Sequence, residues 1–250
     1  MAKYKSLFTI IGTIGGVNFY RLLGKPVNRI AGGGFTREAI KTKASMVRVR
    51  ENNSEFGNCS HLNRIFREAI RPFYLKHKFP LFHSRLMTLF TGLKALDPVS
   101  KRGQRLVFRG LELDEGKRSL LNFAYTPECK PKTVLPFSFD MDWTTYTLMV
   151  PEFHMKQVSF ISGATHIALL FGVLDFNFKT LDYKLHLADT LILPKDFSGD
   201  TLSMTIQSLP TGLGMELGVF GIRYYQEVDG EMYLLSAKNG VGISVFSIKN

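Results

Sequence analysis

Cysteine is almost absent from this sequence, which has only Cys59 and Cys129 among its 250 residues. Two cysteines in different halves of the chain provide neither a disulfide framework nor the ligand spacing of a zinc site. Long apolar runs are also lacking, and no stretch approaches the roughly 18 residues of a membrane-spanning helix. The apolar run over residues 7–11 is short and no clean cleavage site follows it, so we interpret it as a strand. We expect synthesis and folding in the cytoplasm, with release or incorporation into an extracellular assembly left open.

Recognisable catalytic and cofactor motifs are equally scarce. The segment over residues 12–16 lacks the Gly-Lys-Ser/Thr of a phosphate loop, and a strand pattern follows it in place of a helix. Asp140 and Asp142 could begin a calcium loop, but Trp143 follows where further oxygen ligands are needed. The chain contains no Gly-x-Ser-x-Gly nucleophile motif, and its six histidines are dispersed. We therefore expect a protein that is not an enzyme and that carries no cofactor or metal.

What the sequence does contain is apolar side chains and positive charge. Hydrophobic residues make up 45% of the chain and charged residues 21%, which is typical of a globular protein with a sizeable core. The formal net charge of +11 is unevenly placed. Residues 1–125 carry 23 Lys+Arg against 8 Asp+Glu, whereas residues 126–250 carry 9 against 13. This asymmetry favours either contact with a polyanion such as nucleic acid or head-to-tail association between copies.

Turn signals divide the first 34 residues into a β-meander. Gly15-Gly16 and the Gly-Lys-Pro at 24–26 separate short runs of strand-forming residues. The consecutive glycines Gly32, Gly33 and Gly34 then interrupt the pattern and predict a hinge. The apolar strand residues of this segment are candidates for pairing with a sheet edge of another copy: Leu7, Phe8, Ile10, Ile11, Val17 and Phe19.

Residues 35–126 show helical periodicity and are rich in basic side chains. Apolar residues recur on one helix face over 60–73 and again over 82–96. We also expect helices over 42–55, 99–109 and 115–122. Arginines spaced at i, i+3 and i+7 predict two basic ridges that would contact a polyanion or the acids of another copy. The ridge residues are Arg64, Arg67, Arg71, Arg102, Arg105 and Arg109.

A smaller polar group lies near the start of this helical region. Arg50, Glu51, Asn52 and Glu55 fall within about one and a half helical turns. They can form a local network of charge-assisted hydrogen bonds, after which Phe56-Gly57 would end the helix. We interpret this group as a structural clasp in preference to a ligand site.

Residues 127–250 are typical of an all-β domain. Turn residues separate strand patterns over 134–139, 146–150, 166–174, 183–193, 202–207, 217–225, 231–235 and 242–248. Asp229-Gly230 is the strongest hairpin signal in the chain. This spacing favours an antiparallel β-sandwich, immunoglobulin-like or similar. The predicted architecture is therefore α+β, with a β-meander and glycine hinge over 1–34, a basic helical region over 35–126 and a β-sandwich domain over 127–250.

Three strings of residues carry a family resemblance: GTIGGVNFY at 12–20, RVRENNSEFG at 48–57 and YYQEVDGEMY at 224–233. Together they resemble a family of uncharacterised proteins from Bacteroidota bacteria, whose members tend to have R-T-R-E-N-x-x-E-F-G at the second string. The likeness spans nearly the whole chain. It implies the same organisation of N-terminal hairpin, helical middle and β-sandwich end, and it implies no activity, cofactor or catalytic residue. The many Lys and Arg residues in the helices of this chain depart from the family pattern.

These observations predict a non-enzymatic structural protein that forms a homo-oligomer. Its N-terminal strands and its complementary basic and acidic halves would assemble head to tail into a filament, tube or ring. Acids such as Asp196, Asp200, Glu227 and Asp229 would face the arginines of a neighbour. The alternative is a nucleic-acid-binding protein that uses the arginine ridges with little sequence specificity. A β-sandwich that binds carbohydrate or protein also stays open.

Overall fold

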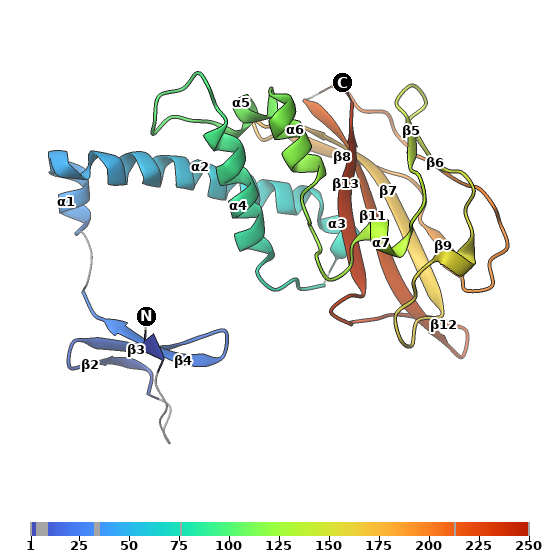
Figure 1. The fold of residues 1–250 in the computed structure, drawn as a ribbon, viewed down its shortest axis with the longest axis horizontal. Coiled ribbons are helices and arrows are strands. Elements are labelled where there is room, and N and C mark those ends of the chain that lie inside the picture. The colour runs from blue at the N-terminus through green and yellow to red at the C-terminus, as the bar shows by residue number, and fades with distance from the viewer. Residues whose placement is uncertain (1, 4–9, 33–35, 76, 213, 250) are drawn as a thin grey trace. The chain divides into compact units, whose positions relative to one another are not determined.

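The computed structural model describes residues 2–3, 10–32, 36–75, 77–212 and 214–249, which fall into two compact units, 1–51 and 52–250. Helices and antiparallel sheets are both present, which confirms the α+β class (Figure 1). The N-terminal β-meander, the helical middle region and the antiparallel C-terminal sheet are confirmed at this level. The finer domain boundaries at residues 34 and 126 stay a prediction. Leu7, Phe8, Gly33 and Gly34 lie outside the described residues.

The first unit contains a four-stranded antiparallel sheet with the order β1-β4-β3-β2. Its strands are β1 (Ala2–Lys3), β2 (Gly12–Ile14), β3 (Val17–Leu22) and β4 (Lys25–Ile30). Gly15 and Gly16 form the turn between β2 and β3 with φ values of 56° and 76°. Glycine adopts this left-handed conformation without steric cost, which explains why the glycine pair marks the hairpin.

A short helical segment follows the sheet within the same unit. It consists of α1 (Arg37–Thr42), the 3₁₀ helix η1 (Ala44–Met46) and the first turn of α2 (Val47–Ala69). Thr36 caps α1, because its Oγ1 accepts a hydrogen bond from the Ala39 N–H at 3.1 Å. Arg50 donates to the carbonyl oxygens of Ile40 at 2.7 Å and Lys43 at 3.0 Å, which ties α1 and η1 to the start of α2.

Helix α2 is continuous over 23 residues, so the predicted helix end at Phe56-Gly57 is wrong. The two helices expected over 42–55 and 60–73 are therefore joined into one, which ends at Ala69. The buried side chains of α2 continue past the glycine: Glu55, Cys59, Leu62, Asn63, Phe66 and Ala69. Packing of this face outweighs the roughly 1 kcal/mol that a glycine costs inside a helix.

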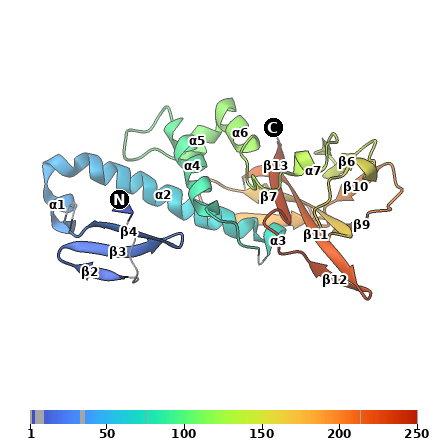
Figure 2. The same cartoon turned by 60° about the horizontal axis from the view of Figure 1, so that its bottom comes forward.

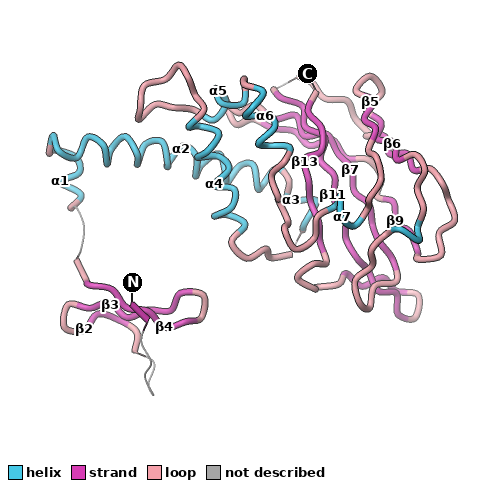
Figure 3. The backbone as a smooth tube through the Cα atoms, in the orientation of Figure 1, coloured by secondary structure: helices cyan, strands magenta, loops and turns pink. Residues whose placement is uncertain are grey.

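The remaining helical elements of the second unit are short, apart from α4. They are α3 (Arg71–Tyr74), α4 (Phe82–Ala95), α5 (Val107–Leu111), α6 (Asp114–Leu121), α7 (Pro131–Val134) and the 3₁₀ helix η2 (Met155–Gln157). The helix expected over 99–109 is wrong, because helical structure begins only at Val107 and residues 99–106 form a loop (Figure 3). The strand expected over 134–139 is also wrong, since α7 ends at Val134 and residues 135–139 are not in a strand.

Nine strands form two antiparallel sheets in the described part of the second unit. They are β5 (Asp140–Asp142), β6 (Thr147–Val150), β7 (His166–Phe176), β8 (Tyr183–Leu187), β9 (Leu191–Pro194), β10 (Leu202–Thr205), β11 (Met215–Val228), β12 (Glu231–Leu234) and β13 (Val241–Ile248). The larger sheet has the path β12-β11-β7-β8, with β13 also paired to β11 and β9 also paired to β7. The smaller sheet has the order β10-β6-β5.

Two apolar cores lie on the two faces of the larger sheet. On one face, side chains such as Phe66 and Phe90 of the helices pack with Leu170 and Leu174 of β7. On the other face, Phe171 of β7 packs in the core that includes the smaller sheet. The second unit is therefore layered as helices, large sheet and small sheet (Figure 2). The two sheets share a core, as in a sandwich, but an immunoglobulin-like class stays a prediction.

Close packing between α5 and α4 depends on Gly110. A Cβ atom at this position would run into the backbone carbonyl of Leu93, which cannot move without disturbing α4. We expect Gly110→Ala to lower the free energy of unfolding by about 1–3 kcal/mol, the usual cost of overpacking. Gly57→Ala is the matched control, because a Cβ there has nothing within 4 Å. That change should raise the stability by about 0.5–1 kcal/mol. Urea unfolding of both variants checks the pair, and equal losses would contradict the packing argument.

Candidate functional site

A row of apolar side chains, exposed at its two ends and half-buried between them, crosses three strands of the described N-terminal sheet. The strand register places Ile14 opposite Val17, and Val17 opposite Ile30, so all three project from one face. Phe19 lies on the same face of β3. Ile14 is 60% exposed and Ile30 is 79% exposed. We call Ile14, Val17, Phe19 and Ile30 the apolar row.

The N-terminal sheet buries little apolar surface of its own. Among residues 10–32, Val27 alone is buried. A sheet normally covers one face with another layer, and contiguous exposed apolar side chains mark contact surfaces. The apolar row is therefore the part of this unit best suited to a partner.

The sequence identified only part of this row. Val17 and Phe19 belong to it, whereas Ile10 and Ile11 precede β2 and are not in a strand. Ile14 and Ile30 were missed, although strand alternation on either side of the Gly15-Gly16 turn could have found them. Gly32 follows β4 in a turn with a φ of 73°, and the hinge over 32–34 stays a prediction.

The positive charge is concentrated in the first unit. Residues 1–51 carry ten Lys+Arg against two Asp+Glu, a net charge of +8, whereas residues 52–250 carry 22 against 19, a net charge of +3. On the sheet face opposite the apolar row, the Arg29 guanidinium lies over the Tyr20 ring at 5.7 Å. Cations lie on both faces of the sheet, because alternation along β3 places Arg21 on the face of the apolar row.

An acidic hairpin projects from the larger sheet of the second unit. Asp229 and Gly230 form its turn with positive φ values of 52° and 82°, as the Asp-Gly pair predicted. We define the acidic hairpin as residues 227–234, in which Glu227, Asp229 and Glu231 are exposed. Val228 and Tyr233 add exposed apolar surface. In the described part of the sheet β12 pairs with β11 alone, so its outer edge can accept another strand.

The first predicted arginine ridge is formed in part. Arg64 and Arg67 lie in α2, and Arg71 begins α3 after the helix break at Ile70. Arg64 and Arg71 are exposed, whereas Arg67 is half-buried and donates from Nε to the Asn63 Oδ1 at 3.0 Å. Two of the three side chains therefore face solvent.

The second arginine ridge does not exist as a helix face. Arg102 and Arg105 lie in the loop before α5, and only Arg109 is helical. Arg102 donates to the Asn52 Oδ1 at 3.1 Å, and Arg109 pairs with the exposed Glu112 at 3.2 Å. The i, i+3, i+7 spacing of these arginines suggested a helix, but no matching apolar periodicity supports one here.

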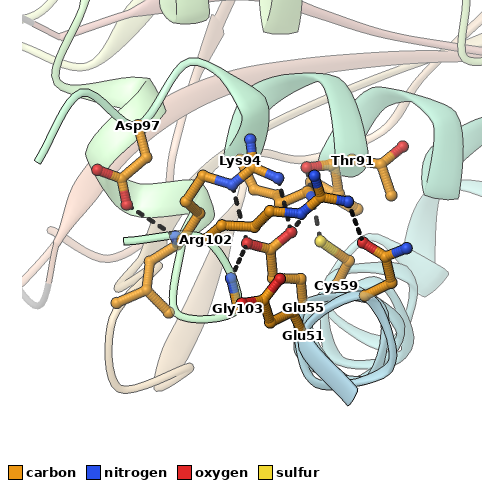
Figure 4. A network of polar contacts seen from close by, with 12 residues as sticks. Glu51, Glu55, Cys59, Thr91, Lys94, Asp97, Arg102 and Gly103 are labelled. Atoms are coloured by element: carbon orange, nitrogen blue, oxygen red, sulfur yellow. Dashed lines mark hydrogen bonds and ion pairs between the residues drawn. The ribbon is translucent and has the colours of Figure 1, made fainter. Parts of the chain in front are cut away.

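Arg105 is held by a buried carboxylate. Glu55 is fully buried on α2, and its two oxygens accept hydrogen bonds from the Nε and Nη2 of Arg105, both at 2.8 Å. The Gly103 N–H donates to the same carboxylate at 2.7 Å, and Lys94 of α4 forms an ion pair with it (Figure 4). These contacts join α2, α4 and the loop before α5. We call Glu55, Lys94, Gly103 and Arg105 the carboxylate clamp.

The carboxylate clamp explains the ionisation of Glu55. The hydrogen bonds from Arg105 hold the pKa of this carboxyl far below its usual range, against the opposing effect of burial. Its oxygens are occupied by fixed donors, so Glu55 is a structural residue. The predicted clasp around Glu55 is therefore structural, but its partners come from α4 and the loop instead of from neighbouring residues on the helix.

Asp97 is a second carboxylate that holds the same loop. Its side chain accepts hydrogen bonds from the backbone N–H groups of Val99, Ser100 and Leu106 at 2.9–3.0 Å. Burial favours the neutral form of Asp97, but these bonds outweigh it and lower its pKa to about 2. Asp97 therefore joins the two ends of the loop, and Glu55 holds its middle.

The described residues contain neither a metal-binding cluster nor a membrane-spanning helix. Throughout residues 10–32, 36–75, 77–212 and 214–249, no three His, Cys, Asp or Glu side chains gather in a way that could hold a metal ion. In the same described part of the chain, no helix has the length and apolar character needed to cross a membrane.

Removal of the Glu55 charge tests the carboxylate clamp. Glu55→Gln leaves Arg105 and Lys94 without their anionic partner, so we expect a loss of about 3–5 kcal/mol in the free energy of unfolding. Glu112→Gln is the matched control, because this carboxylate also pairs with an arginine but is exposed. The control should change stability by less than about 1 kcal/mol. Similar losses in both variants, measured by urea unfolding, would show that the clamp adds nothing beyond a surface ion pair.

The lowered pKa values of Glu55 and Asp97 predict acid sensitivity. Both carboxyls have a lower pKa in the folded state than in the unfolded chain, so the unfolded state binds more protons at low pH. The stabilisation is complete above about pH 5 and declines as the pH falls towards 2. Urea unfolding at several pH values should show this decline in the wild type and a shallower one in Glu55→Gln. Parallel pH profiles would contradict the assignment to Glu55.

Comparison of the chain with protein-family models, with curated proteins and with solved structures gave no match. Three of its surfaces bear on its function. Those surfaces are the apolar row on a strongly basic unit, the acidic hairpin on the second unit and the partly formed arginine ridge.

Proposed function

We propose that this protein is a non-enzymatic structural subunit that assembles head to tail with further copies of itself. The observation that carries the proposal is the apolar row of the N-terminal sheet. Ile14 and Ile30 are largely exposed on a sheet in which, over residues 10–32, only Val27 is buried. Covering this row would remove apolar surface from water, which stabilises a contact by roughly 25 cal/mol for each Å² buried.

A second copy of the chain is the occupant that the charges favour. Residues 1–51 have a net charge of +8, and the acidic hairpin carries three exposed carboxylates on a strand with an open edge. The strand β2 also lies at an edge of its own sheet. Addition of one edge strand to another is a common form of protein recognition, and opposite charges would fix its register. The donor is thus the N-terminal sheet and the acceptor is β12.

Donor and acceptor are different surfaces of the same chain, so the contact is heterologous. Such a contact leaves a free donor and a free acceptor on every oligomer, which generates a filament or tube, or a ring where the rotation closes. We also propose that the β-rich part of the second unit is immunoglobulin-like and that the chain is related to the Bacteroidota family. Neither changes the surfaces on which self-assembly depends.

Nucleic-acid binding is the second candidate. It is supported by the +8 charge of residues 1–51 and by the exposed Arg64 and Arg71. The loss of the second arginine ridge weakens it, because Arg105 is neutralised by the buried Glu55 and Arg102 shares no helix face with Arg109. Any such binding would depend steeply on salt and little on sequence.

Substitution within the apolar row tests self-assembly. In Ile14→Thr/Ile30→Thr the β-branched shape is kept and apolar surface is lost, so the sheet should fold but dock poorly. We expect the mass measured by light scattering on a sizing column to fall towards that of the monomer. Deletion of residues 1–31 should have the same effect. Ile192→Thr is the matched control, because Ile192 is an isoleucine of β9 that is 48% exposed outside the row.

The same column run separates the two candidates. An oligomer that survives both the double substitution and the deletion would overturn the proposal, as would a wild-type protein that is monomeric at every concentration. A monomer that releases material absorbing at 260 nm as salt is raised would support nucleic-acid binding. In that case, replacement of Arg64, Arg67 and Arg71 by Gln should flatten the salt dependence.

A further inference from the structure

A cavity of about 450 Å³ opens beside the carboxylate clamp, entirely within the second unit. Four segments contribute to it: α2, the loop before α5, α5 itself and the β7–β8 connection. Leu62 and Phe178 are buried apolar side chains in its wall, and the half-buried Leu181 lines it as well. Its size falls within the range of small-molecule sites in proteins.

Basic side chains are the charged groups that line this cavity. Arg105, Arg109 and Lys179 come from three different segments, and His61 is added from α2. Among the described residues that form its wall there is no aspartate or glutamate. The cavity therefore combines apolar lining residues with charged lining residues that are all positive.

The cations are concentrated around one aromatic ring. The Arg109 guanidinium lies 4.9 Å from the centre of the Phe108 ring, and the Lys179 ammonium lies 5.9 Å from the same centre. Both cations lie close to the same ring, so their charges add in attracting an anion to this part of the cavity. Phe108 also offers a flat apolar surface to the body of a ligand.

The existing ion pairs leave this positive charge only partly compensated. Glu55 neutralises Arg105 from the buried side and fixes its position. Glu112 pairs with Arg109 at 3.2 Å, but both side chains are well exposed, at 40% and 56%, so this pair is weak. A ligand anion would therefore be attracted mainly by Arg109 and Lys179.

We propose that this cavity binds a small organic anion, in which a carboxylate or phosphate group is attached to an apolar body. The anionic group would lie between Arg109 and Lys179, and the apolar body would pack against Phe108, Phe178 and Leu62. Guanidinium and ammonium groups both suit carboxylate and phosphate oxygens. The proposal does not depend on self-assembly, because the apolar row and the acidic hairpin contribute no residue to the cavity.

Titration calorimetry on the full chain tests the site with four defined probes. Phenylacetate and phenyl phosphate carry an anion and an apolar body, 2-phenylethanol lacks the charge, and inorganic phosphate lacks the body. We expect both organic anions to bind at least tenfold more tightly than either of the other two probes. The tighter of the two anions identifies the headgroup that the site prefers. Their affinity should also fall as salt is raised.

Two substitutions assign the binding to this cavity. Arg109→Gln and Lys179→Gln should each weaken the organic anions by about tenfold, since a charge-assisted contact is lost, and leave 2-phenylethanol unchanged. Arg48→Gln and Lys195→Gln are matched controls. Arg48 pairs with Glu51 at the same i, i+3 spacing, and Lys195 lies over the Phe160 ring at 5.1 Å. Neither residue lines the cavity.

The outcomes separate cleanly. Tight binding of the anions that is lost only in the two cavity variants supports the site. Equal affinity for 2-phenylethanol would show a merely apolar cavity and overturn the proposal. So would equal losses in the control variants, or no binding of either anion at millimolar concentration. Light scattering on the same samples keeps this result apart from the test of self-assembly.

Discussion

The second unit depends on one pair of strands, β7 and β11, that is buried on both faces. Apart from their ends, both strands consist almost entirely of buried residues, and they are paired along eleven consecutive positions from Met215 to Tyr225. Side chains alternate between the helical core and the core shared with the smaller sheet. The helices and the smaller sheet therefore pack on opposite faces of the same two strands. Gly172 and Gly221 contribute by allowing the Phe73 ring to approach this wall closely.

The carboxylate clamp supplies hydrogen-bond partners to a loop that has no regular structure. This loop joins α4 to α5 and lies against the helical layer, so its backbone N–H groups need partners that a helix or sheet would otherwise provide. Asp97 accepts three of its N–H groups, and Glu55 accepts a fourth from Gly103. The hydrogen bond that Arg105 donates to Glu55 also fixes one side of the proposed anion cavity. A buried carboxylate is costly to leave without partners, so loop conformations that break these hydrogen bonds are strongly disfavoured.

The sequence predicted those elements whose signals are local. Gly15-Gly16 and Asp229-Gly230 mark hairpins that the structure contains, because their turns need positive φ values. The apolar periodicity of α2 and α4 was sufficient to predict helices. Signals that depend on distant partners failed. Arg105 has the spacing of a helical ridge, but its position is decided by Glu55, fifty residues away in the sequence. The register that aligns Ile14, Val17 and Ile30 likewise becomes visible only in the folded sheet.

Charge and exposure together separate the roles of the two units. When the chain is divided at residue 51, +8 of the +11 net charge lies in the first unit and +3 in the second. A small sheet with one buried apolar side chain over residues 10–32 gains little from its own packing. The second unit has two extensive cores and needs no such help. Burial against a partner would therefore stabilise the first unit most, and its charge would direct it towards an acidic surface such as the β11–β12 hairpin.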